Sequence, residues 1–425
     1  MPSARHDQAT LRRGNLGLVL RTVYDLGPVS RSDLVRRTGL NRTTMISLVA
    51  ELIDRGLLEE VGNRHPGTAG RPSVLLDIHS RGAVALSAAV GLDRLEVLAS
   101  NLRGRPVAHR ELRLDVPRDS PETVASRLAD LVGDLEGELA GYSGSIAGLV
   151  AIVAGMVDAA SGMVYLSPAL GWQDVPLREL LNEALDGPDY PVLVDRRGRL
   201  CVEAERRAEP GATTRDLVVL FGDLGVGGGA LVNGRTVLGA HGLGGEFAHV
   251  VVDPNGPECD CGARGCLGAL VGLPPLAEAA GLRLGDGSGL AVVVEQLRTR
   301  AADGDDQVVA ELRRQATWLG TAAATLVNVF DPEAVVLAGW FGILAEWMLP
   351  TVRSVLDQRL VLPQRRALDV GASTLGLQAP IHGGVGTVLE HVFADPVGST
   401  GVAPRSKLIS SRSLLGATSR NHSSS

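Results

Sequence analysis

The chain has 425 residues, and at about 100–200 residues per domain this length predicts several domains. Hydrophobic residues make up 45% of the sequence and charged residues 21%, a composition that excludes a mostly disordered chain. No uninterrupted apolar stretch reaches the ~20 residues that a membrane span needs, and the first residues lack the apolar stretch of a secretory signal. We therefore expect a cytoplasmic protein with no membrane partner.

The net charge of −7 is unevenly distributed along the chain. Residues 1–82 carry 12 arginines and 8 acidic residues, and residues 398–425 carry four basic residues and no acidic one. The residues between these segments are therefore strongly acidic. A basic front end on an acidic body indicates contact with nucleic acid, although a short segment can also acquire such a balance by chance.

Residues 10–60 have the spacing of short helices. Apolar residues recur at helical intervals from Asn15 to Asp25, Ser30 is suited to cap a second helix, and Gly39 ends it. A third helix is expected from about Asn41, with one apolar face formed by Met45, Leu48, Val49 and Leu52. Its opposite face is small and polar, as in a recognition helix that enters the major groove of DNA. A three-helix packing unit with no DNA role would show the same pattern.

A predicted strand at 57–61 and a returning strand at 74–78 flank a stretch rich in Gly and Pro. They predict a winged hairpin followed by a linker, so that residues 1–82 form a winged helix-turn-helix domain with its linker. The third helix would contact bases and phosphates, and the wing would contact the backbone or the minor groove. The candidate DNA-binding residues are Asn41, Arg42, Thr43 and Ser47 in the helix, and Arg64, His65 and Arg71 in the wing and linker.

From about residue 83 the sequence alternates short apolar runs with amphipathic helical segments, which predicts an α/β body. The runs expected as strands include 149–153, 192–194, 217–221 and 334–337. Residues 83–397 are sufficient for two lobes with a cleft between them. Residues 398–425 are rich in Ser and Gly and are expected to form a disordered tail.

Three of the four cysteines fall within eight residues, and a histidine precedes them. The spacing His249-x9-Cys259-x-Cys261-x4-Cys266 provides three thiolates and one imidazole, a ligand set that suits tetrahedral Zn²⁺. Four protein ligands leave no open coordination position, so the zinc would be structural. Free buried thiols are the alternative. The fourth cysteine, Cys201, is expected to be a small buried core residue.

Two further features follow predicted strands. The Gly-rich run at 221–229 could place backbone N–H groups against a phosphate, or it could form a tight hairpin turn. Asp195 follows the strand at 192–194 and could act as a general base facing a cleft. It could equally cap a helix or form a salt bridge with Arg196 or Arg197.

The sequence GLGGEFAH at 242–249, followed by CDCGARGCL at 259–267, resembles the signature of the ROK family of repressors, open reading frames and kinases. Ala248 replaces the glycine that usually precedes the histidine. The resemblance covers roughly residues 10–395, and the front end is similar to the DNA-binding arm of the repressor branch, which the kinases typically lack. It implies an actin-like ATPase fold with two α/β lobes and a sugar cleft between them.

The resemblance also implies that the kinase machinery is degraded. The Asp-x-Gly-x-Thr phosphate loop that opens the body of the family's kinases is absent. The catalytic Asp falls on Asp195, while Glu246 and His249 keep two sugar contacts. At two other sugar positions the expected polar residue is replaced by Ala169 and Gly268, and each buried hydroxyl left unpaired would cost ~1–3 kcal/mol.

Together these features predict a DNA-binding transcriptional repressor of carbohydrate-related genes that acts as a homodimer or homotetramer. Its partners would be operator DNA and a sugar or sugar derivative, bound by Asp195, Glu246 and His249, with Asp195 a vestige of the catalytic residue. Zinc would hold the loop that presents Glu246 and His249. Arg196 and Arg197 suggest an anionic effector unless they face solvent. The alternatives are an ATP-dependent sugar kinase with Asp195 as base, and a regulator whose body binds a protein partner.

Overall fold

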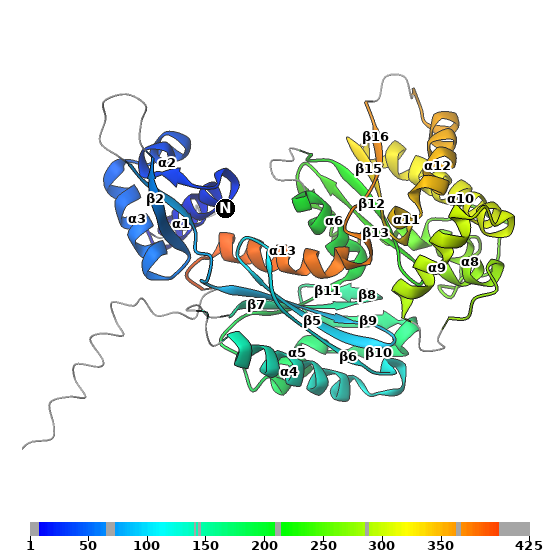
Figure 1. The fold of residues 1–425 in the computed structure, drawn as a ribbon, viewed down its shortest axis with the longest axis horizontal. Helices are drawn as coiled ribbons and strands as arrows, with labels where there is room; N and C mark the ends of the chain where they lie inside the picture. Colours follow the sequence, from blue (N-terminus) through cyan, green and yellow to red (C-terminus); the bar gives the residue numbers. More distant parts are fainter. Residues whose placement is uncertain are drawn as a thin grey trace, which may run out of the picture.

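The computed structural model describes residues 8–64, 73–139, 142, 146–208, 214–284, 289–362 and 367–398. Within these ranges an N-terminal arm precedes a body of two α/β lobes (Figure 1). No helix in the described ranges is long and apolar enough to span a membrane. The predicted tail from residue 399 onward lies outside the described residues, as do His65 and Arg71.

The arm consists of three helices and a small sheet with strand order β1-β3-β2. Its elements are α1 (Gln8–Leu26), β1 (Val29–Ser30), α2 (Arg31–Thr38), α3 (Arg42–Asp54), β2 (Leu58–Arg64) and β3 (Ser73–Ile78). The predicted cap is present, since Ser30 Oγ accepts the backbone N–H of Asp33 at 3.2 Å. Asn41, where the third helix was expected to begin, also caps it: its Oδ1 accepts the backbone N–H of Thr44 at 2.8 Å. The apolar face of α3 is buried, as predicted. Three helices followed by a hairpin are the elements of a winged helix-turn-helix.

The first lobe is built on a five-stranded sheet with the order β11-β7-β4-β5-β6. Its strands are β4 (Val84–Val90), β5 (Arg94–Asn101), β6 (Pro106–Arg113), β7 (Ile146–Val153) and β11 (Val192–Arg196). One face packs against α4 (Pro121–Glu138) and α5 (Leu177–Ala184), and the other against α13 (Ala379–Ala394). Alternate residues of β4 accordingly enter two different apolar cores. A small sheet of β8 (Met156–Asp158), β9 (Met163–Ser167) and β10 (Trp172–Val175) completes the lobe.

The second lobe is built on a sheet with the order β14-β13-β12-β15-β16. Its strands are β12 (Leu217–Gly222), β13 (Val226–Val232), β14 (Arg235–Thr236), β15 (Ala334–Gly339) and β16 (Asp369–Ala372). The helices on one face include α8 (Leu273–Ala279), α9 (Leu290–Ala302), α10 (Asp306–Phe330), α11 (Trp340–Ile343) and α12 (Ala345–Arg359). Helix α6 (Arg197–Ala208) covers the other face and packs beside α13, between the two sheets (Figure 1). The predicted two-lobed α/β body is therefore confirmed.

The Gly-rich run is a β-hairpin. Residues of β12 and β13 pair antiparallel through the run, with Phe221 opposite Gly227 and Gly222 opposite Val226. Of the two interpretations of this run, the structure shows the hairpin.

The apolar core of the arm continues into the first lobe. Leu16, Val19 and Leu20 of α1 belong to the same buried cluster as Val392 and Phe393 of α13. The helices approach closely at Gly17, where an added Cβ would lie 2.0 Å from the carbonyl oxygen of Phe393. Helix α1 begins at Gln8, before the predicted start at Asn15, and its exposed first turns precede the residues that form this packed junction.

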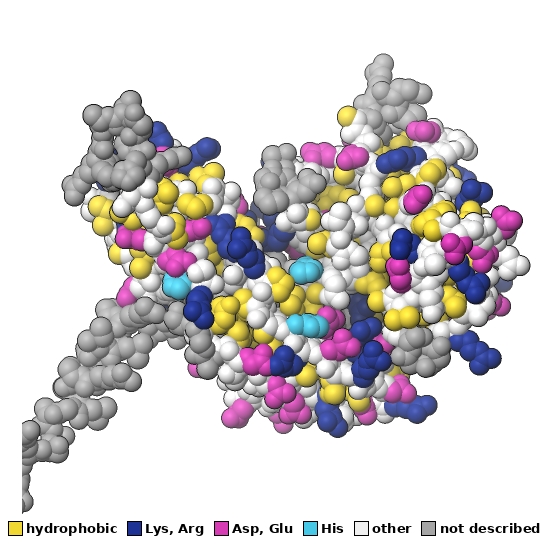
Figure 2. All heavy atoms as spheres, in the orientation of Figure 1, with side chains coloured by type: hydrophobic (Ala, Val, Ile, Leu, Met, Phe, Trp, Pro, Cys, Tyr) yellow, Lys and Arg dark blue, Asp and Glu magenta, His cyan; other side chains and the backbone are white. Residues whose placement is uncertain are grey.

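Charged groups reinforce this junction, where Figure 2 shows Lys and Arg side chains gathered between the arm and the body. Glu390 of α13 pairs with Arg21 of α1 and with Arg206 and Arg207 at the end of α6. Burial favours protonation of Glu390, but the three guanidinium groups hold the pKa of its carboxyl below the ordinary value. The ring of Tyr24 lies 5.1 Å from that of Phe393. Helix α6 is thus joined to the arm through one carboxylate.

Replacing Gly17 by alanine tests the packing of α1 on α13. The new methyl group would collide with the backbone of Phe393, so we expect a loss of about 1–3 kcal/mol in the free energy of unfolding. Gly14→Ala on the same helix is the matched control, because nothing lies within 4 Å of its Cβ position. It should gain about 0.5–1 kcal/mol from helix propensity alone. Urea unfolding of both variants measures the difference, and equal stability would contradict the close approach.

Candidate functional site

The predicted metal ligands converge. One ligand atom from each of His249, Cys259, Cys261 and Cys266 lies within 4.8 Å of all the others. Cys261 Sγ and Cys266 Sγ are 3.7 Å apart, and Cys259 Sγ is 3.7 Å from His249 Nδ1. Four ligands around a tetrahedral ion with a Zn–S bond of ~2.3 Å require separations of about this size. The cluster can therefore hold a metal ion.

Two glycines let the short loop turn around the cluster. Gly262 and Gly265 adopt φ values of +87° and +68°, which disfavour any residue with a side chain. At Gly265 a Cβ would lie 1.4 Å from the carbonyl oxygen of Asp253. The backbone N–H of Cys259 donates to the carbonyl of Ala263 at 2.8 Å, which closes the turn between the first two cysteines.

The two departures from the family signature lie in contact. A Cβ on Gly268, where the family has a polar glutamate, would lie 3.4 Å from the Cβ of Ala248, where the family has glycine. The methyl group of Ala248 would therefore contact the first carbon of any side chain at position 268. His249 follows in a short 3₁₀ turn, Phe247–His249, and its backbone N–H donates to the carbonyl of Glu246 at 3.1 Å.

Asp195 lies near the end of β11 and is buried. Its Oδ1 accepts the backbone N–H of Arg196 at 2.6 Å and Nε–H of Arg199 at 2.6 Å. Burial raises the pKa of Asp195, although the positive charge of Arg199 opposes this shift. Arg199 is one helical turn along α6 and also donates to the carbonyl of Gly242. Of the expected roles for Asp195, the structure shows a salt bridge, but with Arg199 rather than with Arg196 or Arg197.

Arg196 occupies the neighbouring position. Its side chain is 5% exposed and lies 3.1 Å from Glu246 Oε1. It also donates to the carbonyl groups of Gly244 and Gly245. Through its backbone and side chain, Arg196 therefore links Asp195 with Glu246, two of the three predicted effector-binding residues.

Arg197 bridges the two lobes. It pairs with Asp223, which follows β12 of the second lobe, and donates to the carbonyl of Val90 in the first lobe at 2.9 Å. Arg196 and Arg197 thus each have a carboxylate partner in the chain, so neither offers an unpaired charge to the anionic effector that the sequence suggested. The three arginines are matched by three carboxylates of the same chain. Arg199 was not among the predicted site residues, because Asp195 lies on β11 and an i, i+4 spacing predicts a contact only where both residues are helical.

The predicted DNA-binding residues of α3 lie on its exposed face. Asn41, Arg42, Thr43 and Ser47 are all exposed. Asn41 already uses its carbonyl oxygen to cap the helix, and Ser47 Oγ accepts from Arg12 of α1 at 3.1 Å. Arg64 ends β2, whereas Arg71 lies outside the described residues.

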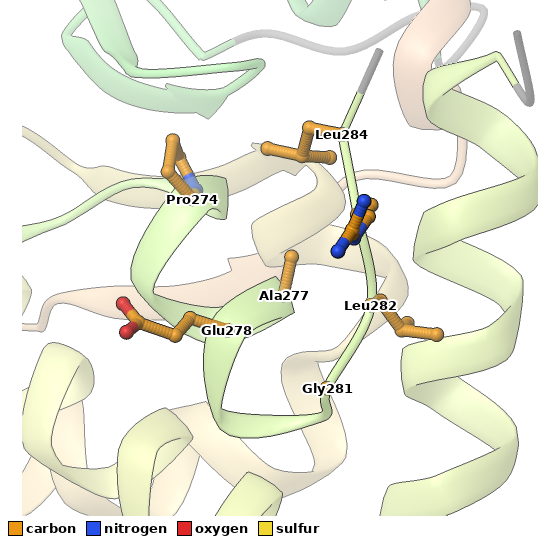
Figure 3. Close-up of a pocket in the computed structure, with 7 residues that line it drawn as sticks. Pro274, Ala277, Glu278, Gly281, Leu282 and Leu284 are labelled. Carbon is orange, nitrogen blue, oxygen red and sulfur yellow. The ribbon is translucent and has the colours of Figure 1, made fainter. Parts of the chain in front are cut away.

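A hollow of about 400 Å³ lies beside α8 (Figure 3). Its lining includes Pro274, Ala277, Glu278, Leu282 and Leu284. None of the predicted site residues lines this hollow.

Comparison with known proteins identifies the family of the chain. The profile of the ROK family matches residues 86–390, so the chain belongs to the ROK family. The "Xylose repressor" of Bacillus spizizenii is 24% identical over 391 residues, covering 92% of this chain and 98% of the relative. The "DNA-binding transcriptional repressor Mlc" of Escherichia coli is 25% identical over 383 residues, covering 88% and 92%.

Solved structures show the same fold. The crystal structure of a ROK family transcriptional regulator, a homologue of the E. coli MLC protein, superposes with a TM-score of 0.75 at 23% identity, covering 92% of this chain and 98% of that one. A ROK family glucokinase from Streptomyces griseus, in complex with glucose and AMPPNP, superposes with a TM-score of 0.58 at 23% identity, covering 71% and 98%. The similarity to the regulator extends over the arm, whereas the glucokinase matches a shorter part of the chain.

Substitution of Arg199 tests the buried ion pair. Arg199→Met leaves Asp195 buried without its guanidinium partner, so we expect a loss of about 3–5 kcal/mol in the free energy of unfolding. Because the pKa of Asp195 in the folded chain then lies further above its unfolded value, the deficit should grow as pH rises and shrink as pH falls. Urea unfolding at about pH 5 and about pH 7.5 measures this dependence.

The double variant Asp195→Asn/Arg199→Met provides the control, since it removes both charges. It should recover most of the lost stability and should show no such pH dependence. A single variant that is as stable as the parent protein at both pH values would contradict the pairing.

Proposed function

We propose that this protein is a DNA-binding transcriptional repressor whose two-lobed body responds to a sugar or sugar derivative. The observation that carries the proposal is the exposed face of α3 on an arm with the winged helix-turn-helix elements, attached to a ROK body. The full-length similarity to proteins named as repressors supports it. Such a regulator would act in the cytoplasm as a homodimer or homotetramer, reading two half-sites.

The cleft between the lobes is the proposed effector site, with Asp195, Glu246 and His249 as its sugar contacts. Support comes from Arg196, which joins Asp195 of the first lobe to Glu246 in the loop that leads to the metal cluster. A ligand that replaces these contacts would alter the relation of the two lobes. Differential affinity for two lobe arrangements would then change DNA binding.

We propose no kinase activity for this body. The general base of a kinase needs a free carboxylate, whereas Asp195 is paired with Arg199. The indole of Trp340, which follows β15, is fully buried and donates to the carbonyl of Asp223 at 2.7 Å. The absent Asp-x-Gly-x-Thr loop would leave Mg²⁺-ATP without its usual positioning.

We propose that the metal is structural zinc, held by His249, Cys259, Cys261 and Cys266. Elemental analysis should find one zinc per chain, lost in Cys259→Ser together with a lower melting temperature, because metal binding stabilises the folded loop. Cys201→Ala is the matched control, since Cys201 is buried in the core away from the cluster and should retain zinc. Equal zinc content in the Cys259→Ser variant would contradict the assigned ligands.

The test of DNA binding is a selection of genomic fragments by the purified full-length protein at several salt concentrations. We expect enrichment of a palindromic site with half-sites about one helical turn apart. Affinity should fall steeply with salt because phosphate contacts release counterions. The genes beside the enriched site indicate which sugars to test, and the change in DNA affinity on adding each sugar then tests the effector. The absence of any enriched site at low salt would contradict the proposed function.

A further inference from the structure

The exposed face of α3 carries one large apolar side chain, Ile46, in addition to the polar residues that were predicted to bind DNA. Ile46 is 61% exposed, while the other apolar residues Met45, Leu48, Val49 and Leu52 of the same helix are buried. It lies one turn after Arg42 and one turn before Ala50, so the three residues share one face. This is the face that also presents Thr43.

The polar residues on this face are partly committed within the arm. The carbonyl oxygen of Asn41 caps the helix, and Ser47 accepts from Arg12, which is itself paired with Glu51 of α3. The side chain of Ile46, by contrast, is exposed and does not belong to the buried apolar cluster of the arm. A β-branched residue at an exposed helix position also lowers helix propensity relative to alanine, so neither core packing nor helix stability accounts for Ile46.

The position of α3 in the molecule indicates which partner can contact Ile46. Figure 1 places α3 on the side of the arm away from both lobes, so the body of the same chain does not cover this face. In the major groove, the 5-methyl group of thymine is the apolar feature among the base edges, and apolar side chains contact it. The N-terminal half of a recognition helix is the part that reaches base edges, and Ile46 lies in its second turn.

We propose that Ile46 is a base-specificity residue that reads the 5-methyl group of a thymine in each half-site. This inference rests on the proposed DNA-binding function and specifies the chemistry of its readout. Arg42 would lie one turn closer to the N-terminus of α3, nearer the phosphates or an adjacent base edge. The operator should therefore contain a thymine at one fixed, symmetric position of each half-site.

Replacement of thymine by deoxyuridine isolates the contact, because it removes only the methyl group and keeps every base-pair hydrogen bond. The probe is the selected palindromic duplex, with deoxyuridine placed at one symmetric pair of thymine positions at a time. Burial of one methyl group contributes ~0.8 kcal/mol, which corresponds to about fourfold in affinity per half-site. At one position pair we expect a loss of about 15-fold for the intact protein, and little change at the other positions.

The variant Ile46→Ala should bind thymine and deoxyuridine duplexes equally at that position, with the affinity of the intact protein for the deoxyuridine duplex. Thr43→Ser is the matched control, since it removes a methyl group from the same face and should leave the deoxyuridine penalty in place. Equal melting temperatures of the parent and both variants verify the fold. This is expected because both side chains are exposed.

Three results with the deoxyuridine duplexes would overturn the inference while leaving the proposed function intact, and a fourth concerns the Ile46→Ala variant on all duplexes. They are a DNA-binding protein with no deoxyuridine-sensitive position, a penalty that persists in Ile46→Ala, and a penalty that disappears in Thr43→Ser. A uniform loss of affinity for all duplexes in Ile46→Ala would also overturn it, because that result indicates a non-specific or subunit contact. Failure of the intact protein to bind any DNA would overturn the proposed function and this inference together.

Discussion

Buried charges require partners, and helix α6 meets this requirement at both of its ends. Near its N-terminus, Arg199 pairs with Asp195 of the proposed effector site. Near its C-terminus, Arg207 pairs with Glu390 of α13, which also pairs with Arg21 of the arm. Displacing α6 would therefore disturb charge pairs at the cleft and at the junction together. Because breaking the buried pair of Arg199 with Asp195 would cost about 3–5 kcal/mol, the N-terminal end of α6 either stays in place or moves with its partner.

The same constraint limits what can bind in the cleft. A ligand that takes the oxygens of Glu246 would leave the buried guanidinium of Arg196 with only the carbonyl groups of Gly244 and Gly245, so a further acceptor on the ligand would favour the exchange. A sugar hydroxyl can both donate to a carboxylate and accept from a guanidinium. A polyhydroxylated ligand can therefore insert between Glu246 and Arg196 and keep both charged groups hydrogen-bonded. An added anion would find the nearby guanidinium groups already neutralised. The pairing of the arginines thus favours a hydroxyl-rich ligand over a strongly charged one.

The sequence predicted the features that depend on local spacing. The cap at Ser30 and the convergence of Cys259 with Cys266 follow from residues close together in the chain, and both are present. The two-lobed α/β architecture followed from the alternation of apolar runs and from the family resemblance. The partners of Glu390 were not predictable from the sequence. Arg21 lies 369 residues away in the chain, and no sequence pattern links two charged residues at such a separation.

The arrangement of the arm adds a geometric consequence. Because α3 lies on the far side of the arm from the lobes (Figure 1), a ligand in the cleft cannot touch the DNA-reading face directly. Any response must pass through the junction of the arm with the first lobe, which includes the ion pair of Arg103 with Asp77 and the contact of α1 with α13, where Gly17 leaves room for no side chain. A contact this close has little freedom to slide, so the arm should pivot as a unit or not at all. In an oligomer, a small pivot of each arm would change the distance between two recognition helices, and DNA half-sites at a fixed spacing would detect it.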